Sequence, residues 1–245
     1  MKLTVIGAAS AYSSKPGRSS SCYLVEHNDT AVLLDLGQGS FSELWRYRSP
    51  AKVAAVFISH MHADHNVDLV PLRHWVKFAN RGYGPALFGP SDIRPRYNAF
   101  QADSDFFDDF RGASLDIGIT RVGDLTIEAA RVTHIPDSFA FRVGTGDGAG
   151  LVYSGDCGVP DDLLPLIHPN DAFLCEAGFG VRREAPGIHL TAGEAGSVAA
   201  QGQVARLVLT HVHDRANADE MLGAARDEFG GDVDLAQPGM TIALA

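Results

Sequence analysis

Short runs of apolar residues recur along the chain, and turn-forming residues such as glycine, proline and aspartate separate them. Runs of about four to eight residues that are rich in valine, isoleucine and leucine are typical of buried β-strands. The pattern predicts strands at residues 2–7, 21–26, 31–36, 53–59, 85–88, 124–133, 138–143, 150–155, 171–176, 204–210 and 239–244.

Longer stretches with apolar residues three and four positions apart are typical of helices that pack one face on a core. They predict helices near residues 40–48, 66–80, 91–101, 191–201 and 216–229. Two of these helices have start signals. Thr191, followed three residues later by Glu194, forms a capping box, and Asn217 precedes the last amphipathic stretch. The pattern alone indicates a mixed α/β fold.

Three histidines and an aspartate directly follow one predicted strand. After the apolar run 53–58 the chain reads Ser-His-Met-His-Ala-Asp-His at positions 59–65. His60 and His62 point to the same side of an extended backbone, whereas Asp64 and His65 follow after the chain begins to turn, which suits two adjacent metal ions. Neutral imidazole and carboxylate favour zinc, and manganese or iron would also fit. The alternative is a solvated loop that is histidine-rich by chance, and the density of ligand-type residues argues against it.

This His-x-His-x-Asp-His segment resembles the signature of the metallo-β-lactamase-fold hydrolases. Three further strand ends match the remaining ligands of that family, namely His134, Asp156 and His211. The resemblance implies a four-layer αβ/βα sandwich. It also implies two metal sites, the first formed by His60, His62, His134 and Asp156 and the second by Asp64, His65, Asp156 and His211.

Two later segments resemble the ribonuclease Z branch of the family. Cys-Glu-Ala-Gly-Phe at 175–179 is similar to its His-Glu-Ala-Thr-Phe motif, and the segment 187–192 is similar to its His-Ser-Thr motif. In that branch the glutamate and the histidine pair near the leaving group, which implies the same role for Glu176 and His189. Cys175 and Gly178 depart from the motif, so identity with ribonuclease Z itself does not follow.

Two N-terminal segments extend the resemblance. Asp-Leu-Gly-Gln-Gly at 35–39 resembles the first motif of the family, whose aspartate orients the metal loop instead of binding metal. The segment 14–19 is a looser match to a Pro-x-Lys-x-Arg-Asn element. Gly37 and Gly39 could bring backbone amides close to a phosphate, although a tight turn explains these glycines equally well.

Two features disfavour a tRNA substrate. Ribonuclease Z carries a long tRNA-gripping arm between its third histidine and its bridging aspartate, yet His134 and Asp156 are only 22 positions apart. The chain has 20 basic and 30 acidic residues and a formal net charge of −10, whereas long polyanions are bound through basic patches. A small phosphoester therefore fits better than a folded tRNA.

Length and composition are those of one globular enzyme. The 245 residues, 45% of them hydrophobic, contain no linker, repeat or low-complexity tract, and we expect one domain over residues 1–245. Cys22, Cys157 and Cys175 lack a paired metal spacing, which favours a reducing, cytoplasmic setting. Since no apolar stretch is long enough to cross a bilayer, we expect no membrane association.

The segment 94–110 interleaves aromatic and acidic residues, Asp103 among them. A lid over the site and a dimer contact are two interpretations, but aromatic residues at helical spacing more often belong to a core. Four other histidines match no ligand position and are expected to be structural or solvated: His27, His74, His168 and His213.

Together these features predict a dinuclear metal-dependent phosphodiesterase that hydrolyses a small diester such as a cyclic nucleotide. Two divalent cations would activate a water and steady the phosphoryl oxygens. Asp64 would help deprotonate that water, and His189, positioned by Glu176, would protonate the leaving alkoxide. The alternatives are a lactonase, thioesterase or β-lactamase on the same fold, a tRNA 3′-processing endoribonuclease, and a non-catalytic metal-binding protein. The resemblance also suggests a homodimer.

Overall fold

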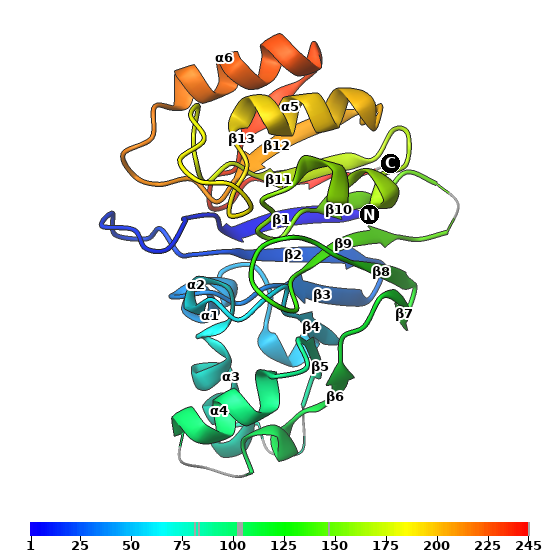
Figure 1. Cartoon of the computed structure of the whole chain (residues 1–245). Coiled ribbons are helices and arrows are strands. Elements are labelled where there is room, and N and C mark those ends of the chain that lie inside the picture. The colour runs from blue at the N-terminus through cyan, green and yellow to red at the C-terminus, as the bar shows by residue number, and fades with distance from the viewer. Residues whose placement is uncertain (81, 83, 102–104, 147, 245) are drawn as a thin grey trace.

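A computed structural model describes residues 1–80, 82, 84–101, 105–146 and 148–244. Two seven-stranded mixed sheets form its centre (Figure 1). The first sheet is antiparallel on one side and parallel on the other, because β3, β4, β5 and β6 run in one direction. Its strands, in spatial order, are β14 (Thr241–Ala243), β1 (Lys2–Gly7), β2 (Cys22–His27), β3 (Thr30–Leu34), β4 (Ala55–Phe57), β5 (Ala86–Gly89) and β6 (Arg111–Ser114).

The second sheet has the same mixed character. Its parallel half brings the carboxyl ends of β10, β11 and β12 to one edge. Its strands, in spatial order, are β13 (Val233–Leu235), β12 (Arg206–Thr210), β11 (Ala172–Glu176), β10 (Leu151–Tyr153), β9 (Phe139–Gly144), β8 (Leu125–Arg131) and β7 (Gly118–Val122). Ligands of open α/β sheets bind outside such carboxyl ends, so this edge is where a site is expected.

Helices cover the outer face of each sheet, which makes four layers. The first sheet carries α1 (Ser40–Leu44), α2 (Ala63–Asn66), α3 (Leu69–Phe78) and α4 (Ile93–Gln101), and the second carries α5 (Ala192–Gln201) and α6 (Ala218–Phe229) (Figure 1). Short 3₁₀ turns lie at Pro50–Lys52, Phe106–Asp109, Pro160–Asp162 and Leu164–Leu166.

Three apolar clusters hold the layers together. The cluster between the sheets joins Tyr23 and Phe57 of the first sheet to Phe141 of the second, and each outer cluster joins one sheet to its helices. Alternate side chains of each strand feed the inner and the outer cluster, as a period of two requires. The predicted four-layer αβ/βα sandwich is therefore confirmed.

The element predictions erred in two places. The helix expected at 66–80 begins later, at Leu69, and a separate short helix at Ala63–Asn66 was not predicted; the chain turns between them at Asp68, whose carboxylate accepts a hydrogen bond from the Phe41 amide (2.8 Å). The strands β6, β7 and β13 were missed. All three are edge strands; β6 and β7 have polar sequences, with most of β7 exposed, and β13 has only three residues. Edge strands lack the apolar run by which a buried strand is recognised.

The aromatic residues of 94–110 are mainly core. Tyr97, Phe106 and Phe107 are buried against α3 and the first sheet, and their rings contact one another. Phe100 differs, since 69% of its side chain is exposed. The expectation for Asp103 lies outside the described residues. Within the described part of the chain, no helix combines the length and the apolar character needed to cross a membrane.

Candidate active site and metal centre

One group of candidate metal ligands joins three loops at the edge of the sandwich. His60 and His62 follow β4, His134 follows β8, and Asp156 follows β10. Ligand atoms of these four residues all lie within 4.8 Å of one another. His62 Nδ1 is 3.1 Å from both His60 Nε2 and His134 Nε2, so three imidazole nitrogens converge on one point.

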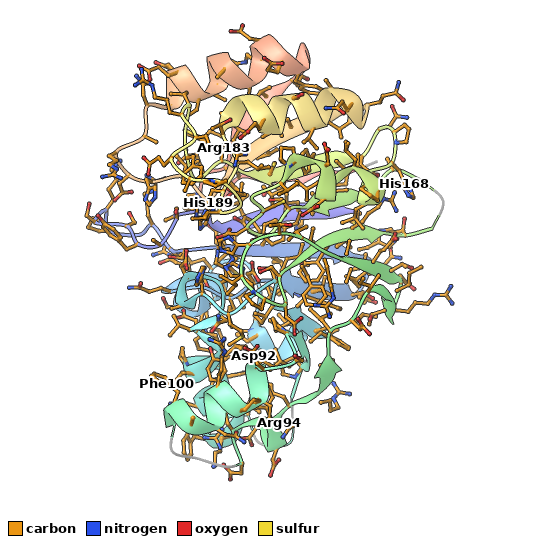
Figure 2. All side chains as sticks on the ribbon, in the orientation of Figure 1. Asp92, Arg94, Phe100, His168, Arg183 and His189 are labelled. Atoms are coloured by element: carbon orange, nitrogen blue, oxygen red, sulfur yellow. The ribbon has the colours of Figure 1, made fainter. Side chains whose placement is uncertain are left out.

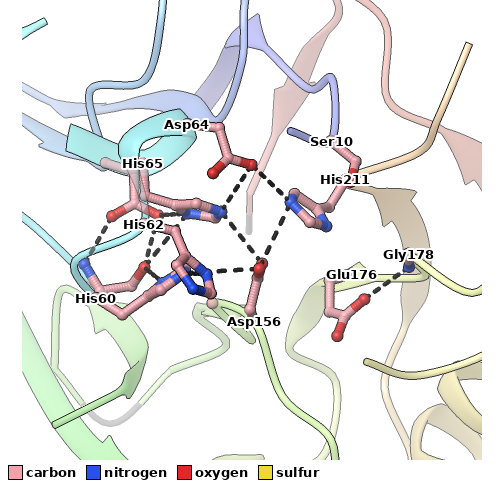
Figure 3. A network of polar contacts seen from close by, with 12 residues as sticks. Ser10, His60, His62, Asp64, His65, Asp156, Glu176, Gly178 and His211 are labelled. Atoms are coloured by element: carbon pink, nitrogen blue, oxygen red, sulfur yellow. Dashed lines mark hydrogen bonds and ion pairs between the residues drawn. The ribbon is translucent and has the colours of Figure 1, made fainter. Parts of the chain in front are cut away.

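A second group lies on the other side of Asp156. Asp64, His65 and His211 also have ligand atoms within 4.8 Å of one another. Asp156 is 3.3 Å from His65 Nε2 through Oδ1 and 3.5 Å from His211 Nε2 through Oδ2. Figure 3 shows the Asp156 carboxylate between the histidine loop and His211. The structure therefore brings together all seven residues that the sequence singled out, with Asp156 in the first group and in contact with the second.

The donor set fits divalent cations. His65 Nε2 and Asp156 Oδ1 are buried and lie 3.3 Å apart, but neither makes a well-formed hydrogen bond, although buried polar atoms are almost always paired. Burial lowers the pKa of His134 to about 4 and holds that of His60 well below its usual value, so both rings are neutral and able to donate a lone pair. Burial opposes the charge of Asp156, but His211 and His65 outweigh it and hold the pKa of this carboxyl well below its usual range.

Neighbouring groups fix the orientation of the histidine rings. Asp35 Oδ2 lies 2.7 Å from His65 Nδ1 and also accepts hydrogen bonds from Ser59 Oγ (2.8 Å) and the Tyr153 hydroxyl (2.6 Å). His134 Nδ1 donates to the carbonyl of Ile188 (2.7 Å). In each ring the Nδ1 proton is held by an oxygen, which leaves Nε2 free to bind a metal. Asp35 therefore has the orienting position that its motif implies.

Glu176 and His189 form a pair beside both groups, and His189 also forms a third group of ligand atoms within 4.8 Å of one another with Asp156 and His211. Glu176 is fully buried, and its two oxygens accept hydrogen bonds from the backbone amides of Cys157, Gly178 and Leu190 at 2.7–3.1 Å. His189 Nδ1 is 3.2 Å from Glu176 Oε1 and 3.8 Å from Asp156 Oδ2. Burial lowers the pKa of His189, but the hydrogen bond and charge of Glu176 outweigh it and raise the net value. These three amide donors fix the Glu176 carboxylate next to the His189 ring.

Asn66 also supports the metal loop, and the sequence analysis did not select it. Its buried side-chain amide donates to the carbonyls of His60 (3.2 Å) and His62 (2.6 Å). The Tyr97 hydroxyl lies 2.6 Å from both the carbonyl and the side-chain oxygen of Asn66. An asparagine following a ligand motif carries no pattern of its own, so only the contact reveals this role.

Asp214 is a second residue that the sequence analysis missed. Its carboxylate accepts hydrogen bonds from Ser13 Oγ and the Ser14 amide, and pairs with Arg18 at 3.3 Å. These contacts tie down the N-terminal loop, whose Ala11 amide donates to Asp64 Oδ2 (2.8 Å). The loosely matching segment 14–19 therefore lies next to the site.

Other selected residues lie apart from the metal-ligand groups. The Gly37 amide donates to the carbonyl of Ser21 (2.9 Å) and is not free for a phosphate. His213 lies on the rim, with Nε2 3.5 Å from Ser10 Oγ, and His168 lies far across the sheet from His189 (Figure 2). Among the described residues, the groups able to hold a metal do not include His27, His74, His168 or His213.

Sequence comparison identifies relatives of the whole chain. A β-lactamase superfamily domain matches residues 30–212. An uncharacterised protein of Mycobacterium tuberculosis is 35% identical over 244 residues, covering 95% of this chain and 88% of that protein. The probable metallo-hydrolase YhfI of Bacillus subtilis is 28% identical over 247 residues and covers 98% of each chain. A ribonuclease Z of Myxococcus xanthus is 25% identical over 302 aligned positions, covering 100% of this chain and 98% of that protein.

Solved structures share the architecture. The crystal structure of Bacillus subtilis YhfI superposes with a TM-score of 0.88 at 24% identity, covering 98% of both chains. Human short-form tRNase Z gives 0.77 at 21% identity, covering 100% of both. A diphosphatase of the PhnP family gives 0.78 at 17% identity, covering 100% of this chain and 98% of that one. By sequence and by fold, this chain belongs to the β-lactamase superfamily and is a metal-dependent hydrolase of the metallo-β-lactamase fold.

Proposed function

We propose that the protein is a dinuclear metal-dependent phosphodiesterase acting on a small diester such as a cyclic nucleotide. The observation that carries this proposal is the position of Asp156, which belongs to the first ligand group and lies 3.3 Å from His65 and 3.5 Å from His211 of the second. We assign the first cation to His60, His62, His134 and Asp156, and the second to Asp64, His65, Asp156 and His211. Zinc suits these nitrogen and oxygen donors, and manganese or iron would also fit.

Two such cations, when bound, supply Lewis-acid stabilisation of the phosphoryl oxygens and a more acidic water. In our proposal the oxygen of water attacks phosphorus, Asp64 takes the water's proton, and the phosphorus–oxygen bond to the leaving group breaks. Asp64 is oriented for this by the Ala11 amide and by His211 Nε2, 3.1 Å away. His189 holds its Nδ1 against Glu176, so its Nε2 can deliver a proton to the departing alkoxide.

Three observations favour a small diester over tRNA. His134 and Asp156 are connected by a short loop and the β9–β10 hairpin, a connection too short for an RNA-binding arm. The alignment with ribonuclease Z runs over 302 positions, although this chain has 245 residues, so that relative has segments absent here. The formal net charge of −10 also disfavours a long polyanion.

Rival activities follow from the same fold. The ribonuclease Z relatives favour tRNA 3′-end processing as a second candidate. Lactonase, thioesterase and β-lactamase chemistry would use the same cations, but the Glu176–His189 pair gives an alkoxide leaving group a proton source. We further propose that the chain functions in the cytoplasm as a single domain and associates as a homodimer.

The test is a substrate panel with purified, zinc-loaded protein. A cyclic nucleotide, a linear phosphodiester, a lactone and a precursor tRNA are assayed at equal enzyme concentration. We expect turnover of the diesters, abolished by a chelator and restored by zinc. Turnover of the lactone or the tRNA alone would replace the phosphodiesterase proposal by the corresponding rival.

A further inference from the structure

A hollow of about 240 Å³ lies between the loop after β11 and the turn after β12. Phe179, Val181 and Met221 supply apolar lining, while Glu184, Arg215 and Glu220 supply the charged lining. We call it the Phe179 hollow. No step of the proposed reaction uses it.

The Phe179 hollow lies directly beside the proposed catalytic residue His189. The rings of Phe179 and His189 are perpendicular, with centroids 5.4 Å apart. The ring of His189 in turn lies 5.2 Å from the rings of both His134 and His211. Both loops that form the hollow follow site residues, Glu176 in one case and His211 in the other. A substrate whose phosphate lies at the two ligand groups therefore extends naturally toward Phe179.

We propose that the Phe179 hollow binds the flat, neutral base of a nucleotide ester, an inference that rests on the proposed phosphodiesterase function and narrows its substrate class. Bases of every kind stack on aromatic rings, and Phe179 offers such a ring next to the chemistry. Val181 beside it is 41% exposed, so apolar surface is available there for a ring to cover.

The charged residues of the hollow indicate whether its occupant is a base or a second phosphate. The lining contains two carboxylates, of Glu184 and Glu220, one guanidinium, of Arg215, and the imidazole of His213. This balance repels an additional phosphate, whereas carboxylate oxygens accept hydrogen bonds from the amino groups of a base. The occupant is therefore a neutral ring with donors at its edge.

A second hollow, lined by Met61, Tyr97 and Phe100, serves as a contrast. Phe100 is 69% exposed on α4, and Figure 2 shows it far from His189. The lining of this second hollow also includes Ala63 and Asn66 of the metal loop, so it is the competing place for a base, and the two hollows are tested against each other. Phe100→Ala is therefore a matched control, because it removes the same side chain from a different surface.

The experiment compares cyclic AMP with the same cyclic phosphate lacking a base, using zinc-loaded wild type, Phe179→Ala and Phe100→Ala. Loss of one stacked ring should raise KM for cyclic AMP about 10-fold in Phe179→Ala. KM for the base-free ester should stay within about twofold, and Phe100→Ala should match wild type for both substrates. Phe179→Leu, which keeps the apolar bulk, is used if the alanine variant does not fold.

Two outcomes would overturn the inference. If Phe179→Ala lowers kcat for both esters equally, Phe179 acts only by supporting His189. If its KM for cyclic AMP equals that of wild type, the base lies elsewhere. A binding titration with adenosine, which is not hydrolysed, tests the inference separately from the proposed function. Wild type should bind adenosine at least about 10-fold more tightly than Phe179→Ala, even if neither ester is hydrolysed.

Discussion

Asp156 is the residue on which the two ligand groups depend. Its carboxylate oxygens lie 3.3–3.8 Å from nitrogens of His65, His211 and His60, among others, so one carboxylate contacts both groups. Removing it would leave each group one donor short, and would also remove the negative charge that offsets two cations.

We therefore predict that Asp156→Ala loses at least one of two bound metals per chain, because each remaining donor set is incomplete. Elemental analysis after dialysis against zinc gives the stoichiometry. Asp227→Ala, an exposed aspartate on α6, is the control and should keep both metals. Two equivalents of zinc in Asp156→Ala would show that this carboxylate does not bridge.

His189 is predicted to act on the substrate more than on the metals. Its Nδ1 is directed to Glu176, which three backbone amides hold in place, so the ring has a fixed partner other than a cation. His189→Ala should keep its zinc but lose about 10²-fold or more in kcat for an ester with a poor leaving group. The loss in kcat should be much smaller for an ester whose leaving group is nitrophenolate, because this leaving group needs little protonation.

His168→Ala controls for the loss of a histidine, since His168 is exposed and far from His189 (Figure 2). It should leave kcat unchanged for both esters. An equal loss for good and poor leaving groups in His189→Ala would argue for stabilisation of transition-state charge instead of proton donation.

At this scale, residues that end a strand in a recognisable motif could be predicted from the sequence. His134 and His211 are single histidines, yet each follows an apolar run, and the family pattern implies the rest. Asn66 and Asp214 could not be predicted. Their roles depend on partners distant in sequence, Tyr97 and Ser13, and neither residue type is unusual in a loop.

At the scale of elements, the site depends on two turns that pack together. The turn after β3 donates from the Leu36 amide to the carbonyl of His65 (2.7 Å), and the Asp68 amide donates back to Leu36 (3.1 Å). Gly37 lies so close to the metal loop that a Cβ there would be 1.9 Å from the carbonyl oxygen of Asp64. The glycine is therefore required for close approach of the two backbones.

Gly37→Ala should displace the metal loop. We expect the overpacking to lower the free energy of unfolding by about 1–3 kcal/mol, and the displaced loop to bind zinc more weakly. Denaturant unfolding of the zinc-free protein and a zinc titration measure the two effects. Gly223→Ala on α6 is the matched control: a Cβ there meets nothing within 4 Å, and the helix should gain about 0.5–1 kcal/mol. Unchanged stability and zinc affinity in Gly37→Ala would refute the close approach.

The bounds of the predicted elements were most accurate for elements that are buried or capped. Strands such as β11, buried along its whole length, and the capped helix α5 were identified within about two residues. β7 was missed because its residues are exposed or only partly buried, and its sequence therefore contains no apolar run. The convergence of β4, β8, β10 and β12 at one edge follows from tertiary pairing, which local pattern does not encode.

For the whole molecule, charge limits the size of the substrate. The net charge is −10, and two basic residues near the site are already paired, Arg18 with Asp214 at 3.3 Å and Arg183 with Glu194 at 2.7 Å. Paired guanidinium groups attract a polyanion weakly, and surface pairs of this kind are screened by salt. One phosphate at the ligand groups needs no such patch.

The last prediction follows from counterion release. A substrate with one phosphate displaces few ions, so kcat/KM for cyclic AMP should change by less than about threefold between 50 and 200 mM salt, whereas a protein with six to ten phosphate contacts loses about 10³- to 10⁵-fold in affinity. Steady-state assays of cyclic AMP and of precursor tRNA at both salt concentrations make the comparison. Efficient tRNA cleavage that falls steeply with salt, without turnover of cyclic AMP, would favour the ribonuclease Z activity, because only a long polyanion gains so much from released counterions.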